Sequence, residues 1–176
     1  MERKNGLGIG IINIGTFLQK EEEVVEMMEK RNIEVLGISE TRDKITGRRV
    51  LHNNYVYFRS SEDDGKHGVG VMVSEKMGQY VSSFESVNNR LMKISVRTQR
   101  QKLAIIQIYA PQQGRPKAEK EDFFNIVQQV IDTCNADEGI IAMGDFNGHV
   151  GQDRHFSIGN RNEQGKPSWI FVPETT

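Results

Sequence analysis

The chain has 176 residues, of which 36% are hydrophobic and 27% are charged, so it holds enough apolar material for one core and little room for a second. We therefore expect a single domain over residues 1–176. The formal net charge of -1 argues against a protein that coats nucleic acid through a broad basic surface, so any nucleic-acid contact must be local or aided by a metal ion. The single cysteine, Cys134, excludes an intramolecular disulfide and a cysteine-based zinc cluster.

The sequence shows no apolar run long enough to span a membrane. The apolar run near the N-terminus lacks the small-residue cleavage site of a signal peptide and is better explained as a buried strand. We therefore expect an intracellular protein, in the nucleus or the cytoplasm, with no membrane partner.

The first part of the chain alternates between strand and helix patterns. Gly8 to Ile14 is apolar and β-branched, which predicts a buried strand. An amphipathic helix is predicted over 17–30, with Thr16 as its N-cap. A second buried strand over 34–39 and a polar loop over 42–49 follow.

The middle of the chain has the alternation of antiparallel strands, which are predicted at 55–59, 68–74, 80–84, 91–97 and 103–109. A second amphipathic helix over 117–133 then leads to a last buried strand over 139–143. Strands in meanders, with one helix after the first strand and another before the last, favour a mixed α+β layered fold. After Val150 the chain is polar and glycine-rich, and we expect an irregular tail over 151–176.

Polar residues stand where four of the predicted strands end, namely Asn13, Glu40, Tyr109 and the pair Asp145 and Asn147. Layered folds place their chemistry at strand ends, because the strands hold the groups rigidly and the loops shape the pocket. Each residue also has a structural explanation, since asparagine, aspartate and glycine form turns, a glutamate can pair with a nearby arginine, and a tyrosine can stand at a sheet edge.

The five residues are suited to chemistry on a phosphate group. A hard cation such as Mg²⁺ prefers oxygen ligands and keeps several waters, so one or two carboxylates suffice to hold it, and Glu40 is a suitable ligand. Uncharged Asn13 and Tyr109 would orient the phosphate without repelling it. Asp145 would contact the metal region or orient the attacking water, and Asn147 would steady the phosphate.

The same residues carry a resemblance to a known family. Asn13, Glu40, Tyr109-Ala-Pro and Gly-Asp145-Phe-Asn147, in this order, resemble the endonuclease/exonuclease/phosphatase superfamily. The stretches LGISETR, HGVGVMVSEKM, NNRLMKISV, IYAPQ and GDFNGHVGQDR look most like the craniofacial development protein 2-like group, which is related to the endonucleases of non-LTR retrotransposons. The resemblance extends from about Gly8 to Gly165.

The resemblance implies a four-layer α/β sandwich with the site at one rim and a divalent cation, Mg²⁺ with Mn²⁺ as the alternative. It implies phosphodiester hydrolysis on nucleic acid, with DNA favoured over RNA. Glu40 would be the metal ligand, and Asn13, Tyr109, Asp145 and Asn147 would form the catalytic set. Arg115, beyond the Tyr-Ala-Pro turn, would bind the substrate.

The sequence also departs from the family pattern. Ile12 stands where a tryptophan is usual, which suggests an altered pocket wall. A late Ser-Asp-His stretch is missing, and neither His149 nor His155, which follow GDFN, is expected to replace it. We therefore expect a sandwich that is incomplete at its C-terminus, with activity weakened by the loss of a general base that typically contributes roughly 10²–10⁴-fold.

Two further hypotheses stay open alongside a metal-dependent nuclease. The first is a non-catalytic remnant of the same fold that acts as an interaction module. The second is a small-molecule-binding α+β domain in which the Gly-Asp-Phe-Asn turn is coincidental.

Overall fold

The computed structural model describes residues 6–147 in full and the backbone of residues 169–173. It contains two five-stranded sheets. In the order of their hydrogen-bonded strands, the first sheet is β1 (Ile9–Asn13), β2 (Val35–Ser39), β5 (Val69–Val73), β4 (Val56–Ser60) and β3 (Gly47–Val50). The second is β10 (Trp169–Pro173), β9 (Gly139–Asp145), β8 (Lys102–Tyr109), β7 (Leu91–Arg97) and β6 (Val81–Asn88).

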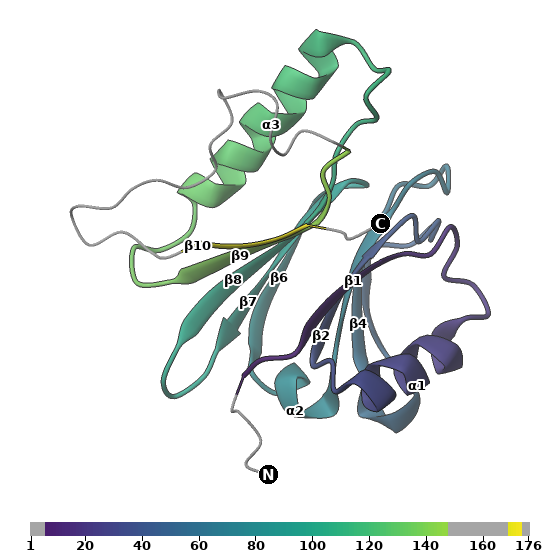
Figure 1. Ribbon diagram of the computed structural model, residues 1–176, viewed down its shortest axis with the longest axis vertical. Helices are drawn as coiled ribbons and strands as arrows, with labels where there is room; N and C mark the ends of the chain where they lie inside the picture. The colour runs from purple at the N-terminus through teal and green to yellow at the C-terminus, as the bar shows by residue number, and fades with distance from the viewer. Residues whose placement is uncertain (1–5, 148–168, 174–176) are drawn as a thin grey trace.

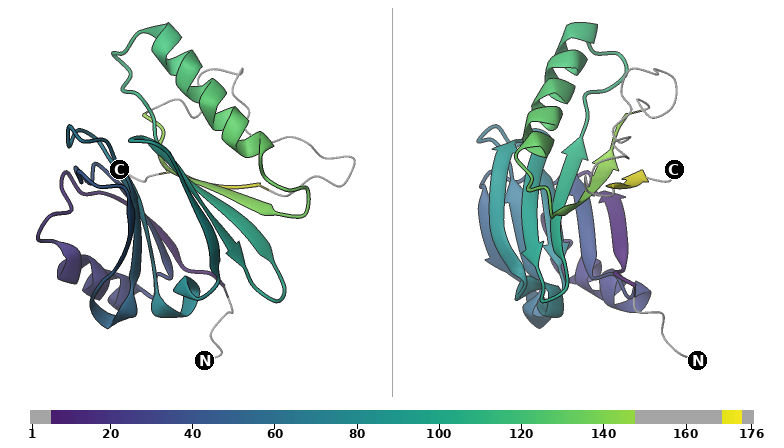
Figure 2. Two further views of the ribbon diagram at one scale, coloured as in Figure 1. Left: turned by 180° about the vertical axis from the view of Figure 1, so that it is seen from behind. Right: turned by 90° about the vertical axis from the view of Figure 1, so that its left-hand side faces the viewer.

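The sheets face each other, and a helix covers the outer side of each (Figure 1, Figure 2). Helix α1 (Glu21–Arg31) packs on the first sheet and α3 (Lys117–Asp132) on the second, while the short α2 (Glu75–Gly78) and a 3-10 turn (His52–Asn54) lie in connections. The order helix, sheet, sheet, helix confirms the predicted α/β sandwich. None of the helices in the described part of the chain is long and apolar enough to cross a membrane.

Period-two alternation along the strands divides the apolar residues into three cores. On β2, Val35 faces the inter-sheet core while Leu36 and Ile38 face α1. On β8, Ile105 and Tyr109 face the inter-sheet core, whereas Ile106 and Ile108 face α3. Burial on both faces explains why these strands have almost continuous apolar sequences.

Helix α1 begins later than the sequence suggests, so Thr16 as its N-cap is wrong. The helix starts at Glu21 after Lys20, which makes no side-chain capping bond. Phe17, expected inside the helix, packs instead against Tyr57, with 4.3 Å between the ring centroids. Burying this aromatic ring under the loop that leads into the helix stabilises a non-helical turn over 17–20.

Two strands differ from the sequence-based prediction: the exposed residues of β3 carry no apolar pattern, whereas β10 is an apolar run, WIFVP, within the predicted irregular tail. β3 lies in the predicted polar loop; it is an edge strand with exposed side chains at Arg48, Arg49 and Val50, and its hydrogen bonds to β4 define it. β10 pairs in parallel with β9, so the expected irregular tail over 151–176 is wrong at residues 169–173. The rest of that tail lies outside the described residues.

Parallel pairing puts several strand ends at one end of the sandwich. β1 and β2 are parallel, with Asn13 opposite Ser39, and β8 and β9 are parallel, with Tyr109 opposite Asp145. We call this end, where the carboxyl ends of these four strands meet, the rim.

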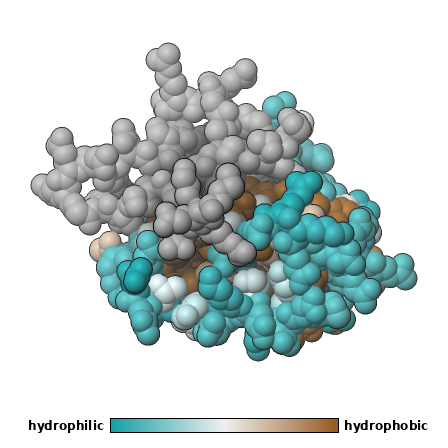
Figure 3. Space-filling view, turned by 60° about the horizontal axis from the view of Figure 1, so that its bottom comes forward, coloured by the Kyte–Doolittle hydropathy of each residue, from teal (hydrophilic) through white to brown (hydrophobic). Residues whose placement is uncertain are grey.

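The opposite end of the sandwich has an open cavity of about 610 Å³. Its lining combines apolar residues such as Leu7, Ile9 and Leu103 with charged ones such as Arg100 and Asp137. Figure 3 brings this end forward and shows apolar residues among polar ones.

Candidate functional site

Glu40 joins the two sheets at the rim. Its Oε1 accepts a hydrogen bond from Asn13 Nδ2 at 3.0 Å and another from the Tyr109 hydroxyl at 2.8 Å. Asn13 ends β1 and Glu40 follows β2 in the first sheet, whereas Tyr109 ends β8 in the second. One carboxylate oxygen therefore fixes the distance between the sheets at this point.

The hydrogen bonds keep Glu40 ionised. The amide of Asn13 lowers the pKa of Glu40 most, burial opposes this by raising it, and the Tyr109 hydroxyl and the positive charge of Arg42 lower it further. Arg42 Nη2 lies 3.6 Å from the second carboxylate oxygen, Oε2. The net pKa is lowered, so Glu40 is a carboxylate at neutral pH and can serve as an anionic ligand.

Tyr109 remains a hydrogen-bond donor over the whole physiological range. Its pKa is raised to about 12 because its hydroxyl is desolvated and donates to the negatively charged Glu40, with a smaller contribution from the charge of Asp145. Glu40 and Asp145 therefore act on the same phenol from two different sheets. Tyr109 also lies opposite Asp145 in the register of β8 and β9, so both carboxylates stand next to the same tyrosine.

The turn after β9 presents Asp145 and Asn147. The backbone N–H of Asn147 donates to Asp145 Oδ1 at 2.8 Å, and its side-chain amide donates to the carbonyl oxygen of Ala110. Gly144 has φ 132°, and a Cβ there would lie 1.9 Å from the carbonyl oxygen of Ile108, so only glycine allows β9 to approach β8 so closely. The motif is thus an Asx turn as well as a functional candidate.

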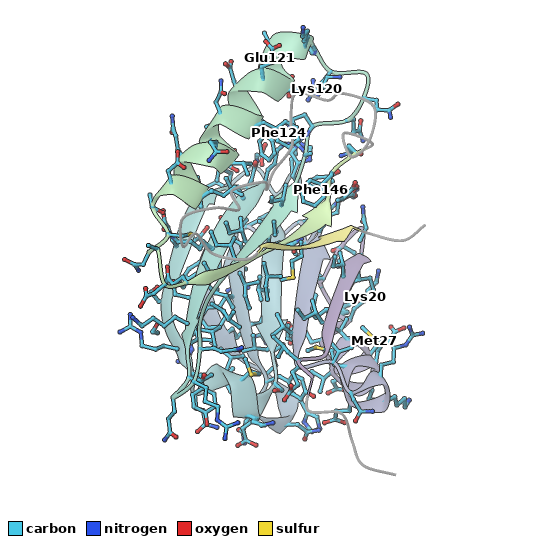
Figure 4. All side chains as sticks on the ribbon, turned by 60° about the vertical axis from the view of Figure 1, so that its left-hand side comes forward. Lys20, Met27, Lys120, Glu121, Phe124 and Phe146 are labelled. Atoms are coloured by element: carbon cyan, nitrogen blue, oxygen red, sulfur yellow. The ribbon has the colours of Figure 1, made fainter. Side chains whose placement is uncertain are left out.

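Phe146 anchors this turn to the outer helix. It is buried and belongs to the apolar core between the second sheet and α3, as does Phe124 of the helix. Figure 4 shows both rings in the space between helix and sheet. The apolar residue between Asp145 and Asn147 therefore holds the two polar ones at the rim.

The backbone at the rim is strained at four positions. Glu40, Arg42, His67 and Asn147 all have positive φ, between 48° and 61°, which is costly for residues with a Cβ. Such conformations collect at functional sites, where the surrounding structure enforces them. Two of these four residues, Glu40 and Asn147, are sequence-based candidates, but positive φ is not confined to the rim, since Gln19, Asn32, Asn53 and Asn54 also have it.

His67 and Arg90 are the residues that the sequence-based reasoning missed. Arg90 lies over the Tyr109 ring, with its Cζ 4.9 Å from the ring centroid, and donates to the carbonyl oxygens of Tyr109 and Ala110 at 3.3 and 3.4 Å. The His67 ring is 5.7 Å from that of Tyr109. No periodicity marks either residue, because each stands in a loop just before a strand.

Arg115 pairs with Glu119 and not with Glu40 or Asp145 in the described part of the chain. It is exposed, its Nε is 3.6 Å from Oε1 of Glu119, and its positive charge lowers the pKa of His67 and of Arg90. Its predicted role in substrate binding therefore stays a prediction. His149 and His155 lie outside the described residues.

The donor set at the rim fits a hard cation that keeps most of its waters. The described residues contain no cluster of three histidine, cysteine, aspartate or glutamate side chains, which a fully protein-coordinated metal would need. One ionised carboxylate, Glu40, with a second carboxylate acting on the same tyrosine, is sufficient for Mg²⁺, which binds through one or two carboxylates.

Comparison with known proteins connects this geometry to a family, although no protein-family model matches the chain. The chain is 25% identical over 165 residues to craniofacial development protein 2 of Bos taurus, and 24% identical over 165 residues to that of Tragulus javanicus. These matches cover 90% of this chain but 28% and 29% of the relatives. The chain thus spans less than a third of their length.

Solved structures with the same fold include three of particular interest. An endonuclease/exonuclease/phosphatase family protein from Leptotrichia buccalis has a TM-score of 0.55 at 17% identity, covering 81% of this chain and 67% of that one. D. rerio TDP2 complexed with single strand DNA product has a TM-score of 0.56 at 16% identity, covering 80% and 60%. The endonuclease domain of TRAS1, a telomere-specific non-LTR retrotransposon, has a TM-score of 0.55 at 15% identity, covering 78% and 57%.

The structural matches establish the fold, and the two curated relatives extend the similarity to the sequence. The predicted resemblance is confirmed at this level. The chain therefore shares the fold of endonuclease/exonuclease/phosphatase proteins and is similar in sequence to craniofacial development protein 2.

Proposed function

We propose that this chain carries the site of a metal-dependent phosphodiesterase that cleaves the backbone of nucleic acid as an endonuclease. The observation that carries the proposal is the hydrogen bond from the Tyr109 hydroxyl to Glu40 across the two sheets. It brings the strand ends of the first sheet to those of the second, so that carboxylates and neutral donors converge at one rim.

The proposed roles follow from the state of each group. Glu40, an ionised carboxylate, would hold a divalent cation, Mg²⁺ with Mn²⁺ as the alternative. When bound, that cation would polarise a phosphoryl oxygen and offset the charge that develops on the leaving group. Asn13 and Tyr109 would orient the phosphate as uncharged donors, and Asp145 would orient the attacking water.

Asn147 would bind the phosphate oxygens from the second sheet. Its backbone N–H bond to Asp145 Oδ1 fixes the two residues relative to each other. A rigid pair of this kind can stabilise developing charge without reorganising during the reaction.

DNA is the proposed substrate class. One structure with the same fold contains a single strand DNA product, and another match is a retrotransposon endonuclease domain. Because the shared fold alone does not carry an activity, the substrate is tested directly.

The test is nicking of supercoiled plasmid DNA with Mg²⁺ and with EDTA. We expect Mg²⁺-dependent nicking that Glu40→Gln and Asp145→Asn each lower roughly a hundredfold or more, because each removes a preorganised charge at the site. Glu34→Gln is the matched control, since Glu34 directly precedes β2 at its other end and pairs there with Lys76.

The proposal fails if the folded chain shows no Mg²⁺-dependent nicking, or if the two rim variants nick as fast as the Glu34 control. A folded chain that binds DNA but never cleaves it would favour the non-catalytic interaction module.

A further inference from the structure

Two polar contacts join the sheets at one level, just below the rim. In the first sheet, Ser39 of β2 and Ser60 of β4 both pair with Val69 of β5. In the second sheet, Gln107 of β8 and Ser86 of β6 both pair with one residue of β7. The amide of Gln107 donates to Ser39 Oγ at 3.2 Å, and the hydroxyl oxygens of Ser60 and Ser86 are 2.5 Å apart.

The contact between Ser39 and Gln107 is the more deeply buried of the two. Both of its residues are fully buried, whereas Ser86 is exposed on an edge strand. A serine hydroxyl can donate or accept, so the hydrogen bond forms whichever way the amide of Gln107 is turned. The surrounding inter-sheet core is apolar, and apolar packing is non-directional, whereas a hydrogen bond requires a defined distance and angle. The pair therefore defines how β2 lies over β8 at this level.

Stability alone does not account for a polar pair at this place. Gln107 Oε1 is buried and has no hydrogen-bond partner among the described residues. An unpaired buried polar atom costs free energy, and replacing both partners of such a pair by apolar side chains of similar shape can be neutral or stabilising. A function beyond holding the core together would explain the two polar side chains.

The same two strands lead directly to the hydrogen bond between Glu40 and Tyr109. Ser39 is the last residue of β2 and immediately precedes Glu40, whose φ of 57° turns the chain out of the extended strand. Gln107 lies two residues before Tyr109, so both side chains are on the inter-sheet face of β8. The position of Ser39 relative to Gln107 therefore sets the distance that the bond between Glu40 and Tyr109 must span.

That bond helps to orient the carboxylate of Glu40. Oε1 accepts hydrogen bonds from Asn13 and Tyr109, and Oε2 lies 3.6 Å from Arg42 Nη2. Hydrogen bonds that orient a metal ligand from outside the coordination sphere typically change metal affinity by roughly 10–100-fold. A longer or broken bond from Tyr109 would therefore weaken the binding of a cation by Glu40.

We infer that Ser39 and Gln107 are positioning residues for the proposed metal ligand Glu40. Their hydrogen bond holds β2 and β8 at the separation at which Tyr109 donates to Glu40, and it thereby holds the carboxylate in the orientation that binds a divalent cation. The inference rests on the proposed function for the cation. It adds a buried support to a site that is otherwise built from residues at the rim.

The first test measures the binding of Mn²⁺ alone, without nucleic acid, from the electron paramagnetic resonance signal of the free ion. Glu40→Gln defines the part of the binding that depends on Glu40. We expect Ser39→Ala combined with Gln107→Met to weaken that part roughly tenfold. The urea midpoint of the same double variant should be at least as high as that of the original chain, because both polar partners are replaced by apolar side chains. A purely structural pair would not separate the two measurements.

Ser60→Ala is the matched control, because it removes the other polar contact at the same level, two strands away from β2 in the first sheet. We expect it to bind Mn²⁺ as the original chain does. Ser39→Ala alone is the smaller change, and it should weaken Mn²⁺ binding even if the double variant does not fold.

Three results would overturn the inference. The first is a folded Ser39→Ala or double variant that binds Mn²⁺ as tightly as the original chain. The second is an equal loss of Mn²⁺ binding in Ser60→Ala, which would show a general effect of contact between the sheets. The third is equal binding by the original chain and Glu40→Gln.

The second test asks whether Ser39 acts through Tyr109. Tyr109→Phe removes the hydroxyl that donates to Glu40 and keeps the ring. We expect Ser39→Ala to weaken Mn²⁺ binding in the original chain and to have little further effect in Tyr109→Phe, because the bond that Ser39 supports is already absent there. Losses of binding free energy that add fully would show that Ser39 acts by another route, and the inference would be wrong.

The two proposals fail separately. Weaker Mn²⁺ binding by the Ser39 and Gln107 variants, in a chain that never nicks DNA, would leave the positioning role and refute hydrolysis. Nicking by a chain in which these variants bind Mn²⁺ normally would refute the positioning role and leave the proposed function.

Discussion

Glu40 shows at the scale of one residue how local contacts set charge. Burial alone would raise the pKa of this carboxyl, yet the combined effect of the Asn13 amide, the Tyr109 hydroxyl and Arg42 lowers it. The hydrogen bonds stabilise the charged form by more than desolvation destabilises it. Since a metal ligand must be deprotonated, this balance prepares the site for a cation before one arrives.

Asn13→Ala should therefore destabilise the fold in a pH-dependent manner. A glutamate whose folded pKa is depressed contributes stability above its unfolded pKa, about 4.3, and this contribution is lost as the pH falls through the lowered folded value. We expect a loss of about 1 kcal/mol at pH 7, the usual net contribution of one hydrogen bond.

Urea unfolding of the original chain and of Asn13→Ala, at pH 7 and at pH 3, measures the loss of unfolding free energy at each pH. The difference in unfolding free energy between the two chains should narrow as the pH falls, because Glu40 becomes protonated as the pH passes its lowered pKa. The control repeats the comparison in chains that also carry Glu40→Gln, where position 40 can no longer titrate. If the effect of Asn13→Ala on unfolding free energy falls equally with pH in those chains, the pH dependence does not come from Glu40.

At the scale of elements, a polar contact links β2 and β8 just below the rim. Gln107 and Ser39 are both fully buried, and the amide of Gln107 donates to Ser39 Oγ at 3.2 Å. Ser39 lies one position before Glu40, and Gln107 lies two positions before Tyr109. Both side chains are on the inner faces of their strands. Gly37 leaves the room that the side chain of Gln107 occupies, since a Cβ there would lie 2.1 Å from Gln107 Oε1.

Gly37→Ala should consequently destabilise the sandwich by about 1–3 kcal/mol, because the added methyl group overpacks the space between the sheets. Gln107→Ala removes the obstructing amide, so the double variant should be more stable than the sum of the two single effects predicts. Chemical denaturation of the original chain, the two single variants and the double variant gives the coupling free energy between the two positions. If the two single effects on unfolding free energy simply add, the two residues do not share this space.

At the scale of the whole molecule, stability should be highest in the middle of each sheet. β5 is buried along its whole length and lies between β2 and β4, and β8 is nearly as buried between β7 and β9. β3 and β6 are edge strands with mostly exposed or half-buried side chains. Opening an edge strand exposes less apolar surface than opening a central one.

Amide hydrogen exchange should follow this order. We expect the amides of β5 and β8 to exchange roughly a hundredfold more slowly than those of β3 and β6, because they open only with the whole sandwich. Hydrogen-exchange mass spectrometry at neutral pH resolves the four segments. Equal protection of β6 and β8 would contradict a core centred on the inner strands.

The sequence by itself determined most of the strands, the two long helices and the five polar residues at the strand ends. Apolar periodicity reports burial, and burial is what defines β2, β5 and β8. It did not report β3, whose exposed residues carry no apolar pattern, or the start of α1, where burial of Phe17 against Tyr57 overrides helix formation.

Only the tertiary structure decided which of these residues meet. That Tyr109 of one sheet donates to Glu40 of the other depends on how two sheets face each other, and no spacing along the chain encodes this directly. The same holds for His67 and Arg90, which stand in loops 23 residues apart and become neighbours only because β5 and β7 begin at the same end of the sandwich. Contacts between layers are set by packing, which acts between segments distant in sequence.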